Sequence, residues 1–215
     1  MKLNRRLCCA LSLLVLFSAQ AEKNRVPPAV ENIIQHQFPV ARAELQTVTA
    51  ALFKEYQQQK NVTALIFYAY GTLKLAAQLA AENNVIAAAE SARLGFFWLD
   101  EAAERYETDA RVRYLRARID AFLPASAGRC VIALSDTHFI LNSAHASPDA
   151  LRSKVKYMRY RALVSCGQEP QATALLNQLK QESPRLTALA LTPDAAPDWD
   201  ISEVTQIVLP LAEGK

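Results

Sequence analysis

The residues whose types and spacing most clearly allow a chemical reaction are two cysteines, Cys130 and Cys166. The pattern of apolar residues places Cys130 at the start of one helix and Cys166 at the end of the next. In an antiparallel pair those two ends lie side by side, so the sequence predicts a disulfide. In the chain-entropy model, closing such a loop stabilises the fold by roughly 4 kcal/mol. A redox-active or metal-binding pair is the alternative, but the Cys-x-x-Cys spacing typical of such pairs is absent.

A second polar group, His138, Asn142 and His145, could share one face of a helix, with Asp136 close by. Zinc ligands on a helix favour spacings of three or four residues between strong ligands. The two histidines are seven residues apart with an asparagine between them. We therefore favour a half-exposed face that enters a loop, and we expect neither a metal nor a cofactor.

Acidic residues gather at Asp100, Glu101, Glu104 and Glu107. Several arginines accompany them, namely Arg105, Arg111, Arg113, Arg116 and Arg118. Acid catalysis would need two of the carboxyl groups to face each other across a cleft. These acids instead follow one another along one predicted helix, a pattern typical of a solvated face with salt bridges. We expect no catalytic residue here, and a hydrolase is the least favoured hypothesis.

A basic series, Arg152, Lys156 and Arg159, lies along one side of another predicted helix. Such a candidate basic face could meet an anionic surface. Ordinary solvation is the favoured interpretation.

Aromatic residues are dense in the first half of the chain. Phe96, Phe97 and Trp98 are consecutive, and three neighbours on a helix span about 200 degrees, so at least one of them leaves the main core face. A side chain that leaves the core could line a concave groove. The candidate groove residues are Tyr70, Phe97, Trp98 and Tyr114.

The elements that position these residues are predicted to be helices throughout. The chain has only five glycines, and helix-favouring residues dominate. Apolar residues recur at steps of three and four, as at Leu45, Val48, Leu52 and Tyr56. The predicted helices cover residues 39–60, 62–82, 84–106, 109–123, 129–142, 148–166 and 169–182. An all-α fold of antiparallel helical hairpins is the expectation.

The segment from Gly167 onward resembles the tetratricopeptide repeat (TPR) family. In that family a glycine, a small residue, a large and a small apolar residue and a proline follow one another at fixed steps. Those steps hold Gly167, Ala172, Leu176, Leu179 and Pro184, with Leu179 larger than the usual alanine. The resemblance implies a TPR-like α-solenoid.

A second, partial match holds Gly95, Leu99 and Ala102, continued by Ala117 in the following helix. Glu107 stands where the family has a proline, so this repeat is degenerate. Small residues at such positions let helices cross closely. We expect three or four TPR-like hairpins of uneven length.

The N-terminal residues are typical of a secretory signal peptide. Lys2, Arg5 and Arg6 precede an apolar run that ends at Phe17, and small residues follow up to Ala21. The run is shorter than the roughly 20 residues of a stable membrane anchor. Cleavage after Ala21 would lower the basic residues from 24 to the number of acidic ones, 21, which removes the electrostatic argument for nucleic acid as a partner.

The predicted organisation is therefore a signal peptide (residues 1–21), an N-terminal lead-in (22–39) and a TPR-like helical domain (40–183), with a linker and tail after it. The tail, residues 184–215, is rich in Pro and Asp and then apolar, and its end could be a short docked helix or a strand. The expected location is the periplasm, with release from the cell as the open alternative.

The expected function is that of a non-catalytic scaffold or adaptor. Helical arrays generally present concave grooves, which would hold an envelope protein or a peptide. The alternative is a small-molecule-binding accessory protein of an envelope transporter, with an apolar pocket among the long helices of residues 62–106. An enclosed cavity would favour that alternative.

Overall fold

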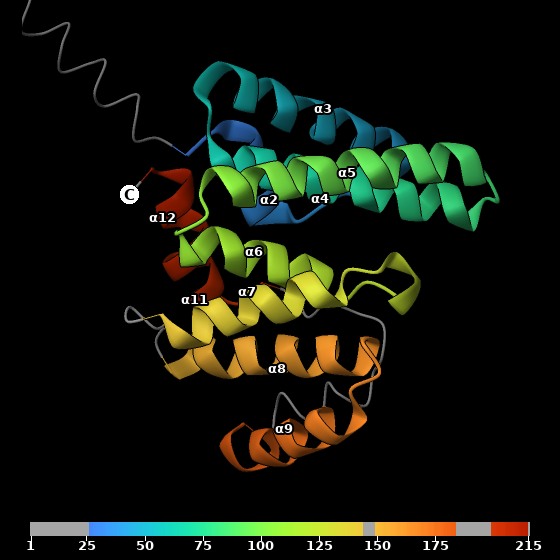
Figure 1. Cartoon of the computed structure of the whole chain (residues 1–215). Helices are drawn as coiled ribbons and strands as arrows, with labels where there is room; N and C mark the ends of the chain where they lie inside the picture. The colour runs from blue at the N-terminus through green and yellow to red at the C-terminus, as the bar shows by residue number, and fades with distance from the viewer. Residues whose placement is uncertain (1–25, 144–148, 184–198, 215) are drawn as a thin grey trace, which may run out of the picture.

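The computed structural model describes residues 26–143, 149–183 and 199–214, and within these ranges it contains helices and no strands. In chain order the elements are α2 (Pro28–His36), α3 (Arg42–Gln59), α4 (Val62–Ala81), α5 (Val85–Arg105), α6 (Ala110–Asp120), the 3₁₀ turn η1 (Ala125–Ala127), α7 (Cys130–Asn142), α8 (Asp149–Ser165), α9 (Glu169–Glu182), α11 (Ile201–Glu203), the π-helical turn η2 (Val204–Val208) and α12 (Leu209–Ala212). Consecutive helices pack in antiparallel pairs, so the all-α prediction is confirmed (Figure 1).

Side chains at the helix starts explain the boundaries of α4, α5 and α6. Asn61, Asn84 and Asp109 each accept a hydrogen bond from a backbone N–H of the first turn, which satisfies donors that have no partner within the helix. Gly167, after α8, has a φ of 69°, which suits glycine at a helix end. The helix boundaries predicted at residues 82–84, 109 and 166 are confirmed to within about a residue.

The structure adds detail at both ends of the described chain. The expected lead-in, residues 22–39, includes α2, whose Val30 and Ile33 are buried. The described part of the C-terminal tail, residues 199–214, is helical, which is one of the two alternatives expected, and Asp200 caps it, because its carboxylate accepts from the first backbone N–H groups of α11.

The core is built around α4, which packs between α3 and α5. By length and composition α4 could also cross a membrane, but in this fold its apolar residues, such as Leu65 and Ile66, are buried against its neighbours. Gly95 lets α5 approach α4 closely, since a Cβ there would lie 2.8 Å from Cγ of Leu73 and 3.0 Å from the carbonyl oxygen of Ala69. Gly95 is in the middle of α5, and its role is this close approach.

Two groups of helices are visible in Figure 1, α2 to α5 and α6 to α9, with α11 and α12 between them. The C-terminal helices contact α4 in the first group and α6 and α8 in the second. The amide of Asn61, at the start of α4, donates to the carbonyl oxygen of Ala212 at 2.7 Å. The chain end therefore joins the two groups.

A disulfide joins the outer ends of α7 and α8. The Cα atoms of Cys130 and Cys166 lie 5.6 Å apart and the sulfurs are bonded. The predicted pairing is confirmed, and so is the antiparallel arrangement that it required.

Candidate functional site

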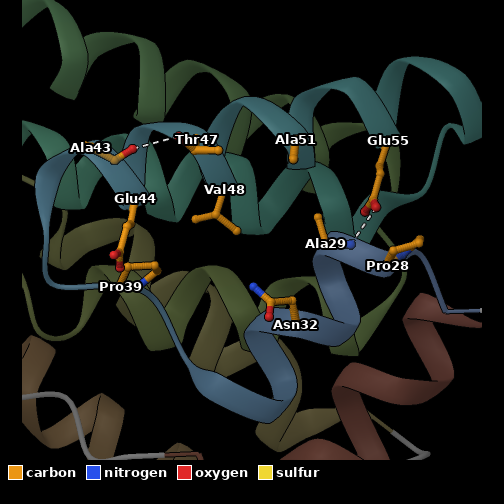
Figure 2. Close-up of a pocket in the computed structure, with 10 residues that line it drawn as sticks. All are labelled: Pro28, Ala29, Asn32, Pro39, Ala43, Glu44, Thr47, Val48, Ala51 and Glu55. Carbon is orange, nitrogen blue, oxygen red and sulfur yellow. Dashed lines mark hydrogen bonds between the residues drawn. The ribbon is translucent and has the colours of Figure 1, made fainter.

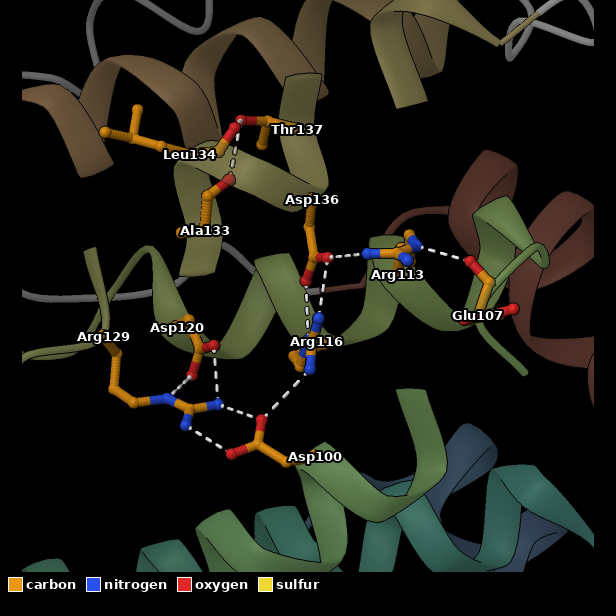
Figure 3. A network of polar contacts seen from close by, with 10 residues as sticks. All are labelled: Asp100, Glu107, Arg113, Arg116, Asp120, Arg129, Ala133, Leu134, Asp136 and Thr137. Carbon is orange, nitrogen blue, oxygen red and sulfur yellow. Dashed lines mark hydrogen bonds and ion pairs between the residues drawn. The ribbon is translucent and has the colours of Figure 1, made fainter. Parts of the chain in front are cut away.

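Three aspartates and three arginines form a continuous network where α5, α6 and α7 meet (Figure 3). We call it the ionic seam. Its members are Asp100 on α5, Arg113, Arg116 and Asp120 on α6, and Arg129 and Asp136 at the start of and within α7.

Arg129 is the centre of one half of the ionic seam. Its guanidinium donates two bonds to Asp100, both 2.7 Å long, and two to Asp120, both 2.9 Å long. It also lies over the ring of Phe96, with its Cζ 4.7 Å from the ring centre. Burial raises the pKa of Asp120 to about 7, although the bonds and charge of Arg129 act in the opposite direction. Burial also raises the pKa of Asp100, but Arg129 and Arg116 outweigh it and hold this pKa below its usual value.

Asp136 is the centre of the other half. Its side chain is fully buried and accepts from Arg116 Nε at 2.7 Å, Arg116 Nη2 at 2.9 Å and Arg113 Nη1 at 2.9 Å. Arg113 also lies over the ring of Phe139, 4.5 Å from its centre. Charge neutralisation of this kind makes burial of a carboxylate tolerable.

The ionic seam corrects the expectation of a solvated charged face for Asp100, Arg113 and Arg116. The expectation holds for the rest of the α5 face, where Glu104 is exposed and Glu101 pairs with the exposed Arg105 four residues later. The sequence of one helix shows which charged residues share a face. It does not show that two other helices bring oppositely charged residues to that face. The paired carboxylates hold three helices together, and each of the three is bound by at least one arginine.

The four candidate groove residues lie in three different places. Trp98 and Phe97 belong to a cluster that also holds Phe53, Tyr56 and Tyr68, at the junction of α3, α4 and α5. We call this cluster the aromatic face. The Phe53 ring centre is 4.5 Å from that of Tyr68 and 5.4 Å from that of Trp98, while Phe97 is 57% exposed.

Tyr70 is separate from the aromatic face. Its ring packs edge-on against Phe38, 5.1 Å between centres, and Lys74 lies over it. Tyr114 was predicted to line a groove, and this is wrong, because Tyr114 is 1% exposed. Its hydroxyl donates to Glu203 at 2.9 Å, and burial, with the negative charge of Glu203, raises the pKa of Tyr114 far above its usual value.

A groove lies instead between α2 and α3, where no candidate had been placed (Figure 2). It has a volume of about 670 Å³, is open to solvent and is lined mainly by apolar atoms. Its walls are Pro28, Ala29 and Asn32 of α2, Pro39 of the connection, and Ala43, Glu44, Thr47, Val48, Ala51 and Glu55 of α3.

The groove exists because small residues line α3 and because one carboxylate fixes its end. Ala43, Thr47 and Ala51 recur every four residues and so share one side of α3. Glu55 Oε1 accepts from the backbone N–H of Ala29 at 2.6 Å, and Oε2 accepts from that of Val30 at 3.3 Å. Glu55 thus supplies the cap that Pro27 cannot give α2. The Pro27–Pro28 pair was the sequence signal for a helix start here.

The candidate basic face is engaged in contacts between helices. Arg152 Nη1 donates to the carbonyl oxygen of Leu141 at 3.3 Å, and Arg159 Nη1 to that of Leu134 at 3.0 Å. Lys156 Nζ pairs with Glu182 of α9 at 2.7 Å. These three cations tie α8 to α7 and α9.

The described residues contain no group of three His, Cys, Asp or Glu side chains placed to hold a metal ion. The Asn142 side chain lies against the His138 ring, 3.1 Å from Nδ1, and its amide donates to the His138 carbonyl oxygen at 2.8 Å. His145, and the predicted signal peptide at the N-terminus, lie outside the described residues.

Comparisons with known proteins do not place the chain in a family. No protein-family model, no curated protein and no solved structure matches it.

Proposed function

We propose that this protein is a non-catalytic adaptor of the cell envelope that holds a helical segment of a partner protein in the groove between α2 and α3. The open, mainly apolar groove of about 670 Å³ carries the proposal. The expected signal peptide supports a periplasmic location. The TPR-like reading of the helical hairpins fits the same function, since such arrays bind peptides in concave surfaces.

The dimensions of the groove suit a helix. The lining on α3 runs from Ala43 to Glu55, a length of about 18 Å at 1.5 Å per residue. A helix of that length and about 10 Å diameter occupies roughly 1,400 Å³, so the groove of about 670 Å³ would seat about half of its volume. Small residues at Ala43, Thr47 and Ala51 would let the two backbones approach closely.

The charge at the ends of the groove defines the partner further. Glu44 is exposed, and the Glu55 carboxylate lies at the other end. A basic residue beside the apolar face of the incoming helix would complement these acids. The expected occupant is thus an amphipathic helix with small apolar residues on one side and a lysine or arginine at its edge.

A pair of adjacent alanines allows a matched test. Ala51 lines the groove, while the next residue back, Ala50, is exposed and does not. A photo-crosslinking residue at Thr47, in cells that naturally express the protein, should capture a defined partner peptide. Ala51→Trp should fill the groove and lower the crosslinked yield at least tenfold, whereas Ala50→Trp should leave it unchanged.

Mapping the crosslinked peptide decides the chemistry of the partner. An apolar helical segment with a basic edge is expected. Equal capture in the two tryptophan variants would contradict the proposal, because it would show that the groove is not the contact surface. Circular dichroism checks that both variants keep the helical content of the wild type.

The small-molecule accessory protein is the second candidate, and the groove volume favours it in one respect, because ligand sites typically enclose about 300–1,000 Å³. Its open side is the argument against it. Native mass spectrometry of the purified protein discriminates the two candidates. If the groove binds a small molecule, Ala51→Trp should release that ligand, while the yield of crosslinked peptide should not fall.

A further inference from the structure

Residues 199–214 form a C-terminal strap that packs against helices from much earlier in the chain. The strap comprises Trp199, Asp200 and the continuous helical run of α11, η2 and α12. It contacts α4, α6 and α8. The chain reaches it from α9 through residues 184–198.

The strap places one carboxylate among three donors. Glu203 is 2% exposed, and its Oε1 accepts from Tyr114 Oη at 2.9 Å and from Arg118 Nε at 2.8 Å. Its Oε2 accepts from Lys154 Nζ at 3.0 Å. Lys154 also pairs with Asp200. Two cations and a phenol, from α6 and α8, thus recognise two carboxylates of the strap.

The strap also brings one aromatic ring, that of Trp199, against α6 and α4. The guanidinium of Arg118 lies 3.7 Å from the ring centre of Trp199, and the Phe67 ring of α4 lies 6.2 Å from it. We call Phe67, Tyr114, Arg118 and Lys154 the socket. Its chemistry selects a tryptophan followed by carboxylates one and four positions later.

The strap fits the socket imperfectly. Gln206 Oε1 is buried and has no hydrogen-bond partner among the described residues, which costs stability. The segment Val204–Val208 is π-helical, a rare geometry that often marks functional sites. A crevice of about 10 Å³ remains beside Glu203, between Tyr114 and Tyr157. Buried ion pairs contribute little net stability because desolvation offsets their attraction.

From these observations we propose that the socket is a peptide-binding site for Trp-Asp-x-x-Glu segments, and that the strap is its resident ligand, which a partner segment of the same chemistry can replace. The proposal is independent of the α2/α3 groove. In the resting protein the strap occupies the site because its tether gives an effective concentration in the millimolar range.

The test uses the full mature chain and a fluorescent peptide that copies residues 199–214. Glu203→Lys places a third cation beside Arg118 and Lys154 and should release the strap. The peptide should then bind this variant at least tenfold more tightly than it binds the wild type, as measured by fluorescence anisotropy. Glu104→Lys, an equal charge change at an exposed position of α5, should bind it like the wild type.

Two further variants decide whether the binding is at the socket. Adding Arg118→Met to Glu203→Lys should abolish the gained binding. A peptide with Gln at the position of Glu203 should bind at least tenfold more weakly. Binding that survives both changes would overturn the proposal, as would equal binding to the wild type and to Glu203→Lys.

A nicked wild-type protein keeps the proposal testable if Glu203→Lys does not fold. A protease site inserted within residues 184–198 allows the strap to be cut from the folded chain. The cut strap should remain bound during size-exclusion chromatography and should exchange with an excess of the labelled peptide. Loss of helical content after cutting, or absence of exchange, would show that the strap is a fixed part of the core. Ala51→Trp should not alter the exchange, which separates this test from that of the groove.

Discussion

The α4–α5 pair and the α6–α7 pair are both antiparallel hairpins, but opposite means hold them together. In the first pair, Gly95 brings α5 against Leu73 and the backbone of Ala69, and the contact is apolar. In the second, Asp136 of α7 is buried against Arg113 and Arg116 of α6. One shape can thus be reached by close packing or by neutralised charge. The two differ in what breaks them.

The largest expected effect is in the ionic seam. Asp136→Ala leaves two arginines largely buried with no carboxylate from α7, and breaking a buried pair in this way costs about 3–5 kcal/mol. Urea denaturation followed by circular dichroism measures the free energy of unfolding. Glu104→Ala, at an exposed position, is the control and should change it by no more than about 0.5 kcal/mol. A cost for Asp136→Ala near that of the control would show that water replaces the carboxylate freely.

A smaller effect is expected in the apolar pair. Gly95→Ala puts a methyl group 2.8 Å from Leu73 Cγ, and overpacking costs about 1–3 kcal/mol, offset by roughly 1 kcal/mol of helix propensity. A net loss of up to about 2 kcal/mol should follow in the same urea experiment. Combining it with Leu73→Ala should remove the clash with that side chain, so the two costs should not fully add. A stabilised Gly95→Ala variant would show that the helices separate without cost.

The smallest effect is a local response to pH, and the two tryptophans of the chain report the two regions separately. Burial raises the pKa of Asp200, but its bonds with Lys154, Ser202 and the backbone of Glu203 outweigh burial and lower it from 3.8 to about 2. A carboxylate with a lowered pKa stabilises the folded state above pH 4, and this contribution is lost as the pH falls from about 4 to 2.

Trp98→Phe leaves Trp199 of the strap as the emitter, and Trp199→Phe leaves Trp98 of the aromatic face. Fluorescence of the first variant should change between pH 4 and pH 2. The second should stay constant over that interval unless the whole fold is lost. A simultaneous change in both would show that the strap does not respond on its own.

The helices themselves could be predicted from the sequence to a large extent. Periodic apolar residues such as Leu45 and Leu52 indicated α3, and Asp109 and Gly167 marked helix ends, because these signals act within a few residues. The disulfide followed from the same information, since its two cysteines stand at facing ends of neighbouring helices. The short α2 was missed, although Pro27 and Pro28 stand at its start.

The sites could be predicted far less well. The acids and arginines of α5 and α6 were identified as a cluster, but the alternation of charges along a helix is the same for a solvated face and for a buried seam. Tyr114 was expected in a groove, yet its environment is made by Glu203, which is 89 residues away. The α2/α3 groove is lined mainly by small and apolar residues, and together with Glu44 and Glu55 they form no motif that would single it out.

What the sequence determined by itself is local: helix positions, their ends and the order of the hairpins, because hydrogen bonds within each helix and between adjacent helices link residues that are close in the chain. The tertiary structure alone decided which charges are buried, which aromatic residues are exposed and where the chain end docks. These depend on the desolvation of each group by distant segments, as when Glu203 meets Arg118 and Lys154.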